Sequence, residues 1–162
     1  MSLTIPRVRG QANFKDCLDE FVRADRLSGD NKYNCDGCKR KVNALKSTCV
    51  EKSPRVLIVD FKRYSSGKKY NEIIQYPKSF SLKRYLSSAI DFSNLEKLGK
   101  KHSLKQSDSP EIFDLFGVIV HAGSSRSFGH YYSYCRGFDE KWYKCNDESI
   151  SQINGVEGAL GK

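Results

Sequence analysis

The chain has 162 residues, of which 38% are hydrophobic, and it carries a formal net charge of +9 at pH 7. This length suffices for one modest hydrophobic core, so we expect one domain or part of one. Apolar runs such as residues 56 to 59 are too short to cross a membrane, and residues 1 to 10 lack the apolar core of a signal peptide, so we expect neither a membrane protein nor a secreted one.

The first regular element is predicted to be an amphipathic helix at residues 14 to 24. Residues 1 to 12 look extended, because Pro6 and Gly10 argue against a helix. Asn13 can cap the helix that follows, whose apolar residues recur at spacings of three and four. These residues are Phe14, Cys17, Leu18, Phe21 and Val22. Since Cys17 belongs to this apolar stripe, its thiol is expected to be buried rather than catalytic.

Cys35 and Cys38 form a C-x-x-C loop, which lets two thiolates face one metal ion. A structural zinc ion takes four ligands, and the chain has no second C-x-x-C pair. We therefore interpret the pair as half of a zinc site, with a plain turn that holds no metal as the alternative. The six cysteines do not form a disulfide-dense pattern for this length, so we expect an intracellular protein, in the nucleus or cytoplasm.

A basic run extends from residue 36 to residue 69, with ten Lys or Arg residues against three acidic residues. Such a run most often forms a solvated surface. The alternative is a surface that binds nucleic acid, which would favour the nucleus or nucleolus.

Residues 55 to 64 mix an apolar run with alternation, which predicts a strand in the centre of a sheet. Residues 65 to 69 are predicted to form a hairpin loop, after which residues 73 to 77 lead to a second pairing segment. Residues 82 to 112 give only a broken helical pattern, with loop composition at 99 to 101 and 107 to 110.

The pattern that follows predicts a meander of three strands. The strands are expected at residues 114 to 121, 129 to 136 and 141 to 146. A thiol nucleophile needs an imidazole to take its proton, and the imidazole needs an acceptor on its other nitrogen. His130 near the start of the second strand and Asn146 at the end of the third are candidates for these two roles. His121 is interpreted as a structural histidine, because one imidazole is enough.

The segment around His130 resembles the histidine box of the ubiquitin-specific protease family. The matching residues are Phe113, Leu115, Gly117, His121, Gly123 and Gly129-His130-Tyr131, with Phe113 where the family usually has tyrosine. Upstream matches are Cys17-Leu18, Phe21, Leu27-Ser28-Gly29, Tyr33-Asn34-Cys35, Cys38, Ala44, Lys46, Pro54-Arg55-Val56-Leu57 and Phe61-Lys62-Arg63-Tyr64. The resemblance thus covers most of residues 14 to 150, and several motifs in one order are more specific than any one of them.

This resemblance implies an α+β fold of the papain-like cysteine protease class, of the ubiquitin-specific protease type, with fingers and palm built on a mainly antiparallel sheet. Residues 14 to 76 would form the fingers and the leading palm strand. Residues 77 to 112 would be an insertion near the substrate channel, and residues 113 to 150 the palm with the histidine box. Residues 1 to 162 as a whole would be part of a catalytic domain, without the thumb that bears the nucleophile.

The activity that the resemblance implies is that of a deubiquitinating thiol protease, which hydrolyses the bond after the C-terminal glycine of ubiquitin. Its partners would be ubiquitin and ubiquitinated proteins, and it would need no cofactor for catalysis. His130 would be the catalytic base, Asn146 its orienting partner and Asp147 a nearby polar helper. The residues that would bind substrate are Tyr131, Tyr64, Gly129 and Gly123.

The nucleophile is the part of the pattern that this sequence does not contain. The resemblance places a G-N-T-C-type box before the histidine, and no such box occurs between Met1 and Lys162. The second cysteine pair of the family's zinc site and the apolar run of its closing strand are also missing. We therefore expect a C-terminal half that is inactive alone and that binds zinc only with upstream ligands. The alternatives are a catalytically inactive ubiquitin-binding or scaffold protein and a basic nucleic-acid-binding zinc module.

Overall fold

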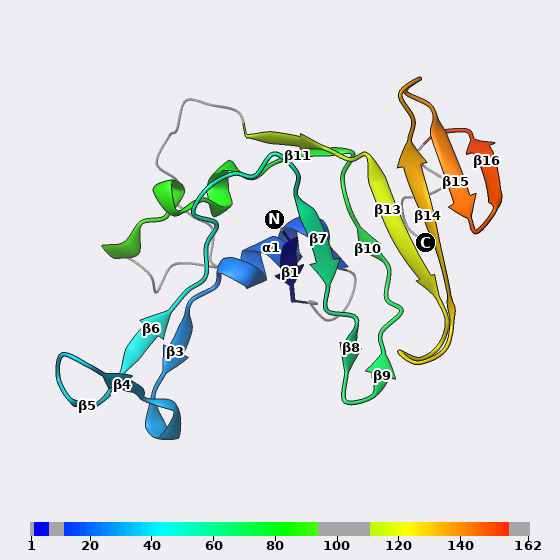
Figure 1. Ribbon diagram of the computed structural model, residues 1–162. Helices are drawn as coiled ribbons and strands as arrows, with labels where there is room; N and C mark the ends of the chain where they lie inside the picture. Colours follow the sequence, from blue (N-terminus) through cyan, green and yellow to red (C-terminus); the bar gives the residue numbers. More distant parts are fainter. Residues whose placement is uncertain (1, 7–11, 94–110, 156–162) are drawn as a thin grey trace.

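The computed structural model describes residues 2 to 6, 12 to 93 and 111 to 155. A body of short strands around one α-helix carries a long arm on one side and a four-stranded sheet on the other (Figure 1). Within the described residues, no helix has the length and apolar character needed to cross a membrane. The loop-like segments predicted at 99 to 101 and 107 to 110 lie outside the described residues.

Helix α1 (Phe14–Val22) forms where the sequence predicts it and ends two residues earlier. A reciprocal capping box begins it: the Asn13 side chain accepts the Asp16 N–H at 2.9 Å, and the Asp16 carboxylate accepts the Asn13 N–H at 3.3 Å. The chain leaves helical geometry at Arg23, which has φ −56° and ψ 137°. Cys17 is fully buried, as its place on the apolar stripe predicts.

The core lies between α1 and the segment from Leu82 to Ile90, which contains the 3-10 helices η2 (Lys83–Tyr85) and η3 (Ser87–Ala89). Leu82 is fully buried, and Tyr85 and Leu86 pack in the same cluster as Leu18. The predicted insertion at 77 to 112 is therefore no peripheral loop at its start, because it supplies one side of the core. Its broken helical pattern reflects two single turns of helix.

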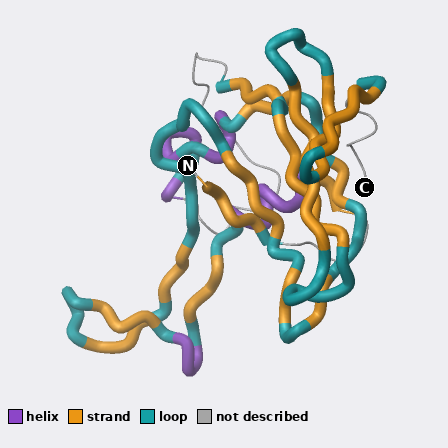
Figure 2. The backbone as a smooth tube through the Cα atoms, turned by 45° about the vertical axis from the view of Figure 1, so that its right-hand side comes forward, coloured by secondary structure: helices purple, strands orange, loops and turns teal. Residues whose placement is uncertain are grey.

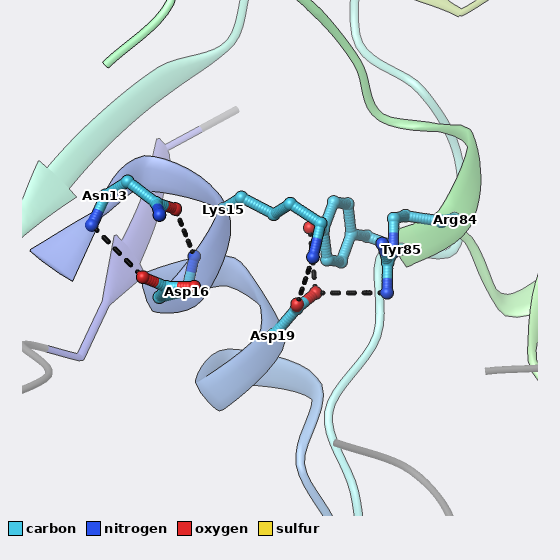
Figure 3. A network of polar contacts seen from close by, with 6 residues as sticks. All are labelled: Asn13, Lys15, Asp16, Asp19, Arg84 and Tyr85. Atoms are coloured by element: carbon cyan, nitrogen blue, oxygen red, sulfur yellow. Dashed lines mark hydrogen bonds and ion pairs between the residues drawn. The ribbon is translucent and has the colours of Figure 1, made fainter. Parts of the chain in front are cut away.

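A polar network joins α1 to η2 at the edge of this core (Figure 3). The Asp19 carboxylate accepts a hydrogen bond from the Tyr85 hydroxyl at 3.0 Å and pairs with Lys15 at 2.7 Å and with Arg84 at 3.3 Å. Burial, and next to it the charge of Asp19, raise the pKa of Tyr85 well above its usual range. The buried tyrosine thus stays protonated and keeps donating to Asp19.

The arm is built from two antiparallel ladders joined end to end, and it points away from the body (Figures 1 and 2). Its elements are β3 (Asp25–Leu27), the 3-10 helix η1 (Gly29–Asn31), β4 (Tyr33–Cys35), β5 (Arg40–Val42) and β6 (Ala44–Lys46). Eight of the ten basic residues from 36 to 69 are exposed, on the arm and beyond it. Arg63 and Lys69 are the two half-buried exceptions. The exposure fits both a solvated surface and a surface that binds nucleic acid, so the choice between them stays a prediction.

The predicted central strand at 55 to 64 is wrong in length and position. The strand is β7 (Ile58–Phe61), and among the described residues it pairs only with β1 (Ser2–Ile5), in parallel. After it come the hairpin β8 (Tyr64–Ser65) and β9 (Lys68–Lys69), and then β10 (Ile74–Gln75), which pairs with β2 (Ala12–Asn13). The hairpin predicted here is confirmed, with its loop at Ser66-Gly67.

The four-stranded antiparallel sheet confirms the predicted meander and adds a strand to it. Its order is β13 (Gly117–Ala122), β14 (His130–Arg136), β15 (Trp142–Asn146) and β16 (Ser149–Ile153). A separate pair, β11 (Ser79–Ser81) with β12 (Ile112–Asp114), leads into it. Contrary to the expectation from the missing apolar run, β16 follows the turn after Asn146. Its residues are mostly polar and exposed, so ladder pairing with β15 forms it without an apolar pattern.

Candidate active site

His130 and Asn146 meet because they lie on one face of the four-stranded sheet. Side chains alternate along a strand, so His130 shares a face of β14 with Tyr134, four residues on. Tyr134 pairs with Lys144 of β15, and Asn146 lies two residues beyond Lys144. The register therefore brings the first residue of β14 and the last residue of β15 together at one end of the sheet (Figure 1).

The imidazole of His130 is held by the amide of Asn146. The distance from His130 Nε2 to Asn146 Oδ1 is 2.5 Å, and a carbonyl-type oxygen there accepts the Nε2–H. This contact fixes the tautomer that carries its proton on Nε2, which leaves Nδ1 as a proton acceptor. The described geometry thus provides an oriented base with one nitrogen available for chemistry.

Asp147 approaches the same imidazole through a bend in the chain. Asp147 and Glu148 form the two-residue loop between β15 and β16, and Asp147 adopts a left-handed conformation with φ 49°. The bend brings Asp147 Oδ2 to 3.6 Å from His130 Nε2. The Asp147 side chain is 73% exposed, so water screens its charge, and Asn146 is the stronger orienting partner.

His121, one residue before the end of β13, is held by the hairpin β8–β9. The Tyr64 hydroxyl lies 2.8 Å from His121 Nδ1, and Lys69 Nζ donates to the carbonyl oxygens of His121 and Gly123, each at 2.7 Å. The ring of Tyr131 lies 4.6 Å from that of His121 between centroids. These contacts agree with a structural role for His121. Tyr64 and Tyr131, both predicted to bind substrate, are thus brought to one histidine beside the base.

The two glycines predicted to bind substrate lie against the His121 ring. A Cβ atom at Gly129 would overlap that ring and lie 2.7 Å from the Ala122 carbonyl oxygen, and Gly129 has φ 153°. A Cβ atom at Gly123 would lie 2.8 Å from the Gly129 Cα atom. Close packing within the chain therefore already requires glycine at both positions.

All six cysteines are described, and none shares the face of the sheet that carries His130. Cys17 is buried inside the body, and Cys135 and Cys145 are odd-numbered neighbours on β14 and β15, so they point to the opposite face. Their sulfur atoms lie 3.4 Å apart, and this hydrogen bond raises the pKa of the Cys135 thiol. In this arrangement no described thiol lies on the face of the sheet that carries His130.

Cys35 and Cys38 have the local geometry of a metal-binding turn at the tip of the arm. The backbone N–H of Cys38 points to Cys35 Sγ at 3.4 Å, and this bond, with weaker ones from the Cys38 thiol and the Gly37 N–H, lowers the pKa of Cys35. A depressed pKa favours the thiolate that binds metal. Among the described residues, however, no group of three or more His, Cys, Asp or Glu side chains converges there or elsewhere. Two cysteines without further ligands fit both interpretations of the pair, half of a zinc site and a plain turn, so the zinc site stays a prediction.

Lys69 is the residue near the site that sequence reasoning missed. It belongs to the basic run predicted to be solvated, and its two carbonyl partners lie more than fifty residues away in sequence. The sequence feature that could have indicated its role is its place in the predicted hairpin, where strand pairing sets Lys69 opposite Tyr64.

Comparisons with known proteins agree on one family. The family model described as ubiquitin carboxyl-terminal hydrolase matches residues 21–158. The chain is 33% identical over 144 residues to the probable ubiquitin carboxyl-terminal hydrolase 16 of Schizosaccharomyces pombe, covering 86% of this chain and 28% of that protein. It is 30% identical to the inactive ubiquitin carboxyl-terminal hydrolase 17-like protein 7 of Homo sapiens, covering 96% of this chain and 26% of that protein.

Solved structures give the same result. The SAGA Ubp8/Sgf11/Sus1/Sgf73 DUB module bound to ubiquitin aldehyde contains a chain that matches with a TM-score of 0.74 and 27% identity. The match covers 99% of this chain and 33% of that one. A second structure of the module, bound to monoubiquitin, matches with a TM-score of 0.75 and 25% identity, covering 99% and 32%. The chain therefore spans about a quarter to a third of the length of these proteins.

Proposed function

This chain belongs to the ubiquitin carboxyl-terminal hydrolase family, and from that membership we propose that it supplies the base-bearing part of a cysteine-type deubiquitinase. The reaction is hydrolysis of the bond after the C-terminal glycine of ubiquitin. The observation that carries this proposal is the contact of 2.5 Å between His130 Nε2 and Asn146 Oδ1. In a thiol protease one imidazole nitrogen faces the thiol, and the other needs an acceptor that orients the ring. Asn146 Oδ1 is that acceptor for His130 Nε2.

The predicted fold class agrees with this membership. The chain has the α+β fold of the ubiquitin-specific protease type, with mainly antiparallel sheets and few helices. We assign the arm, residues 23 to 49, to the fingers predicted within residues 14 to 76, and the four-stranded sheet to the palm predicted at residues 113 to 150. The candidate site lies at the end of the palm.

The proposed chemistry follows from the free nitrogen of His130. Nδ1 takes the proton of a cysteine thiol, and the thiolate attacks the carbonyl carbon of the last glycine of ubiquitin. The imidazolium then gives its proton to the leaving amine, so the peptide or isopeptide bond breaks and a thioester remains. Water, deprotonated by the same nitrogen, hydrolyses the thioester and regenerates the thiol. Since the six cysteines here face elsewhere, the proposed reaction needs a thiol from outside these 162 residues.

Substrate contacts are proposed on the sides of this base. Alternation places Tyr131 on the face of β14 opposite His130, so the proposed channel would pass over the end of the strand. There the exposed Tyr131 ring, the Tyr64 ring and the narrow backbone at Gly123 and Gly129 would line it and admit a tail of two glycines. Larger side chains on the tail would clash with the two rings. The two structural neighbours are bound to ubiquitin or its aldehyde, which supports ubiquitin as the partner, and we propose that the arm holds its folded body.

A structural zinc ion is proposed at the tip of the arm, held by Cys35 and Cys38 with two further ligands from outside this chain. The complete protein should contain one zinc ion per molecule, and the double variant Cys35→Ser/Cys38→Ser should lose it, because two ligands alone hold zinc poorly. Elemental analysis by mass spectrometry of the purified protein measures this. Cys49→Ser is the matched control and should keep the metal. A wild-type protein without zinc would instead establish the plain turn.

Nucleic acid is proposed as a weaker alternative partner, supported only by the exposed basic residues of the arm and the following segment. Such binding would favour a nuclear or nucleolar location within the cell. It requires no part of the site around His130.

A second candidate function is that of an inactive ubiquitin-binding or scaffold protein. The matched human relative whose name calls it inactive, together with the orientation of the thiols away from His130, supports it. The ordered contact between His130 and Asn146 argues against it, because a protein without chemistry has no need of an oriented base.

A ubiquitin molecule with an electrophile at its C-terminus separates the two candidates. We expect the complete protein to form one covalent adduct with this probe, visible as a mass increase equal to one ubiquitin. The variant His130→Ala should label much more slowly, because its thiol would no longer be deprotonated by the imidazole. Absence of any adduct, in a protein that still binds ubiquitin, would establish the inactive candidate.

A further inference from the structure

The hairpin β8–β9 is a stiff element at the edge of the site. Tyr64 and Lys69 pair across it. At its base the guanidinium of Arg63 donates to the carbonyl oxygen of Glu72 at 2.7 Å, and the Tyr70 N–H donates to the Arg63 carbonyl oxygen at 2.8 Å. The hairpin therefore presents the side chains of Tyr64 and Lys69 from a braced support.

Both of these side chains bind the end of strand β13. Lys69 Nζ donates to the carbonyl oxygens of His121 and Gly123, and the Tyr64 hydroxyl meets His121 Nδ1. The two carbonyl groups lie on either side of Ala122, which pairs directly with His130 across the ladder. The ammonium group is thus fixed to the two residues that flank the cross-strand partner of the base. A half-buried cation with two carbonyl acceptors makes charge-assisted bonds, which are stronger than neutral ones.

His121 also contacts the other side of the base. Its ring lies against Gly129, close enough that a Cβ atom there would overlap Nε2. Gly129 immediately precedes His130, so the ring limits where the chain can enter β14. The same ring lies 4.6 Å from the Tyr131 ring, just after the base. His121 therefore contacts the residues on both sides of His130.

We propose that His121, Tyr64 and Lys69 are positioning residues, which set the place of His130 by holding its cross-strand partner and its two sequence neighbours. The inference rests on the proposed function for His130. It changes the role expected for Tyr64, because the hydroxyl of that residue is bonded to His121 and only its ring is free to face a substrate. Displacement of an oriented base by about 1 Å costs up to about a hundred-fold in rate, so these contacts have a measurable consequence.

Turnover of a fluorogenic ubiquitin C-terminal amide by the complete protein tests the inference. Lys69→Met and Tyr64→Phe should each lower kcat, Lys69→Met by about ten-fold or more, with KM changed less than about two-fold. Lys69→Arg keeps donors for both carbonyl groups and should recover most of the loss. The matched controls are Lys141→Met and Tyr143→Phe, which each remove a contact with Asp139 at the far end of the sheet and should leave kcat unchanged.

A raised KM with unchanged kcat in Lys69→Met and Tyr64→Phe would overturn the inference and make both residues substrate contacts. The second measurement needs neither substrate nor thiol: the imidazole nitrogen resonances of His130 in the substrate-free protein. They should shift in Lys69→Met and Tyr64→Phe but not in the two controls, and unchanged resonances would overturn the inference. If the wild-type protein shows no turnover, the proposed function fails and this measurement alone decides the positioning role. Tyr64→Phe removes one hydroxyl from an exposed side chain, so it keeps the test decisive if Lys69→Met does not fold.

Discussion

Replacing His130 with alanine should lower the turnover of a ubiquitin C-terminal amide by the complete protein about a hundred-fold to ten-thousand-fold, which is the range for loss of a general base. The thiol would then depend on water to remove its proton, and the leaving amine would lack a proton donor. Affinity for ubiquitin should stay within about two-fold, since the side chain acts on the reacting atoms rather than on the bound body. Steady-state kinetics and a binding titration measure the two quantities.

Asn146→Ala is the informative companion to this variant. It leaves the imidazole in place and removes the acceptor at 2.5 Å from Nε2, so turnover should fall less than in His130→Ala. Asp147 could then accept part of the bond from its position at 3.6 Å. Asn34→Ala is the control: it removes an exposed amide side chain from strand β4 of the arm, far from His130, and should leave turnover unchanged. If His130→Ala retained wild-type turnover, the base would lie elsewhere and the proposed chemistry would be wrong.

Gly129→Ala should destabilise the protein strongly. The added methyl group would overlap the His121 ring and approach the Ala122 carbonyl oxygen to 2.7 Å, and φ 153° is strained for alanine. Because one obstacle is backbone, it cannot move away without breaking the β13–β14 ladder. Backbone strain of this kind costs about 1 to 3 kcal/mol, and the overlap adds to it. Urea unfolding of the complete protein measures the change in the free energy of unfolding.

Gly117→Ala is the matched control on the same strand pair. A Cβ atom there would meet the Tyr134 carbonyl oxygen at 3.7 Å, an ordinary contact, so the variant should unfold within about 1 kcal/mol of the wild type. Equal stability of the two variants would contradict the packing described around His121. If Gly129→Ala lost activity but not stability, the added methyl group would displace His130 without weakening the fold.

The meander that carries the site could be predicted from sequence because its information is local. Alternating residues and short loops fix neighbouring antiparallel strands, and their register then sets His130 and Asn146 on one face. The position of Asp147 could not be predicted from sequence. In a regular strand its side chain would point away from His130, and the left-handed conformation at Asp147 directs it toward the imidazole.

Other features could not be predicted because their partners are distant in sequence. Strand β7 pairs with β1, more than fifty residues earlier, and its continuous apolar run predicts burial without saying which strand lies beside it. The single helical turns between Leu82 and Ile90 are too short to show a period, although Leu82 is fully buried. Lys69 has the local composition of a solvated lysine, and only the tertiary fold gives it two carbonyl acceptors.

The arm should unfold more easily than the body, because it contains no buried core residue of its own. Val22 and Val50 are buried at its two ends, and no described residue between them is buried. Its contacts to the body at this base include the bond from the Ser47 hydroxyl to the Val22 carbonyl oxygen, at 2.7 Å. Segments of this kind open as cooperative units of their own, at lower free energy than the whole molecule. Binding of the proposed zinc ion at the tip of the arm should therefore slow amide hydrogen exchange from residue 23 to residue 49. It should leave the urea midpoint for unfolding of the whole molecule nearly unchanged.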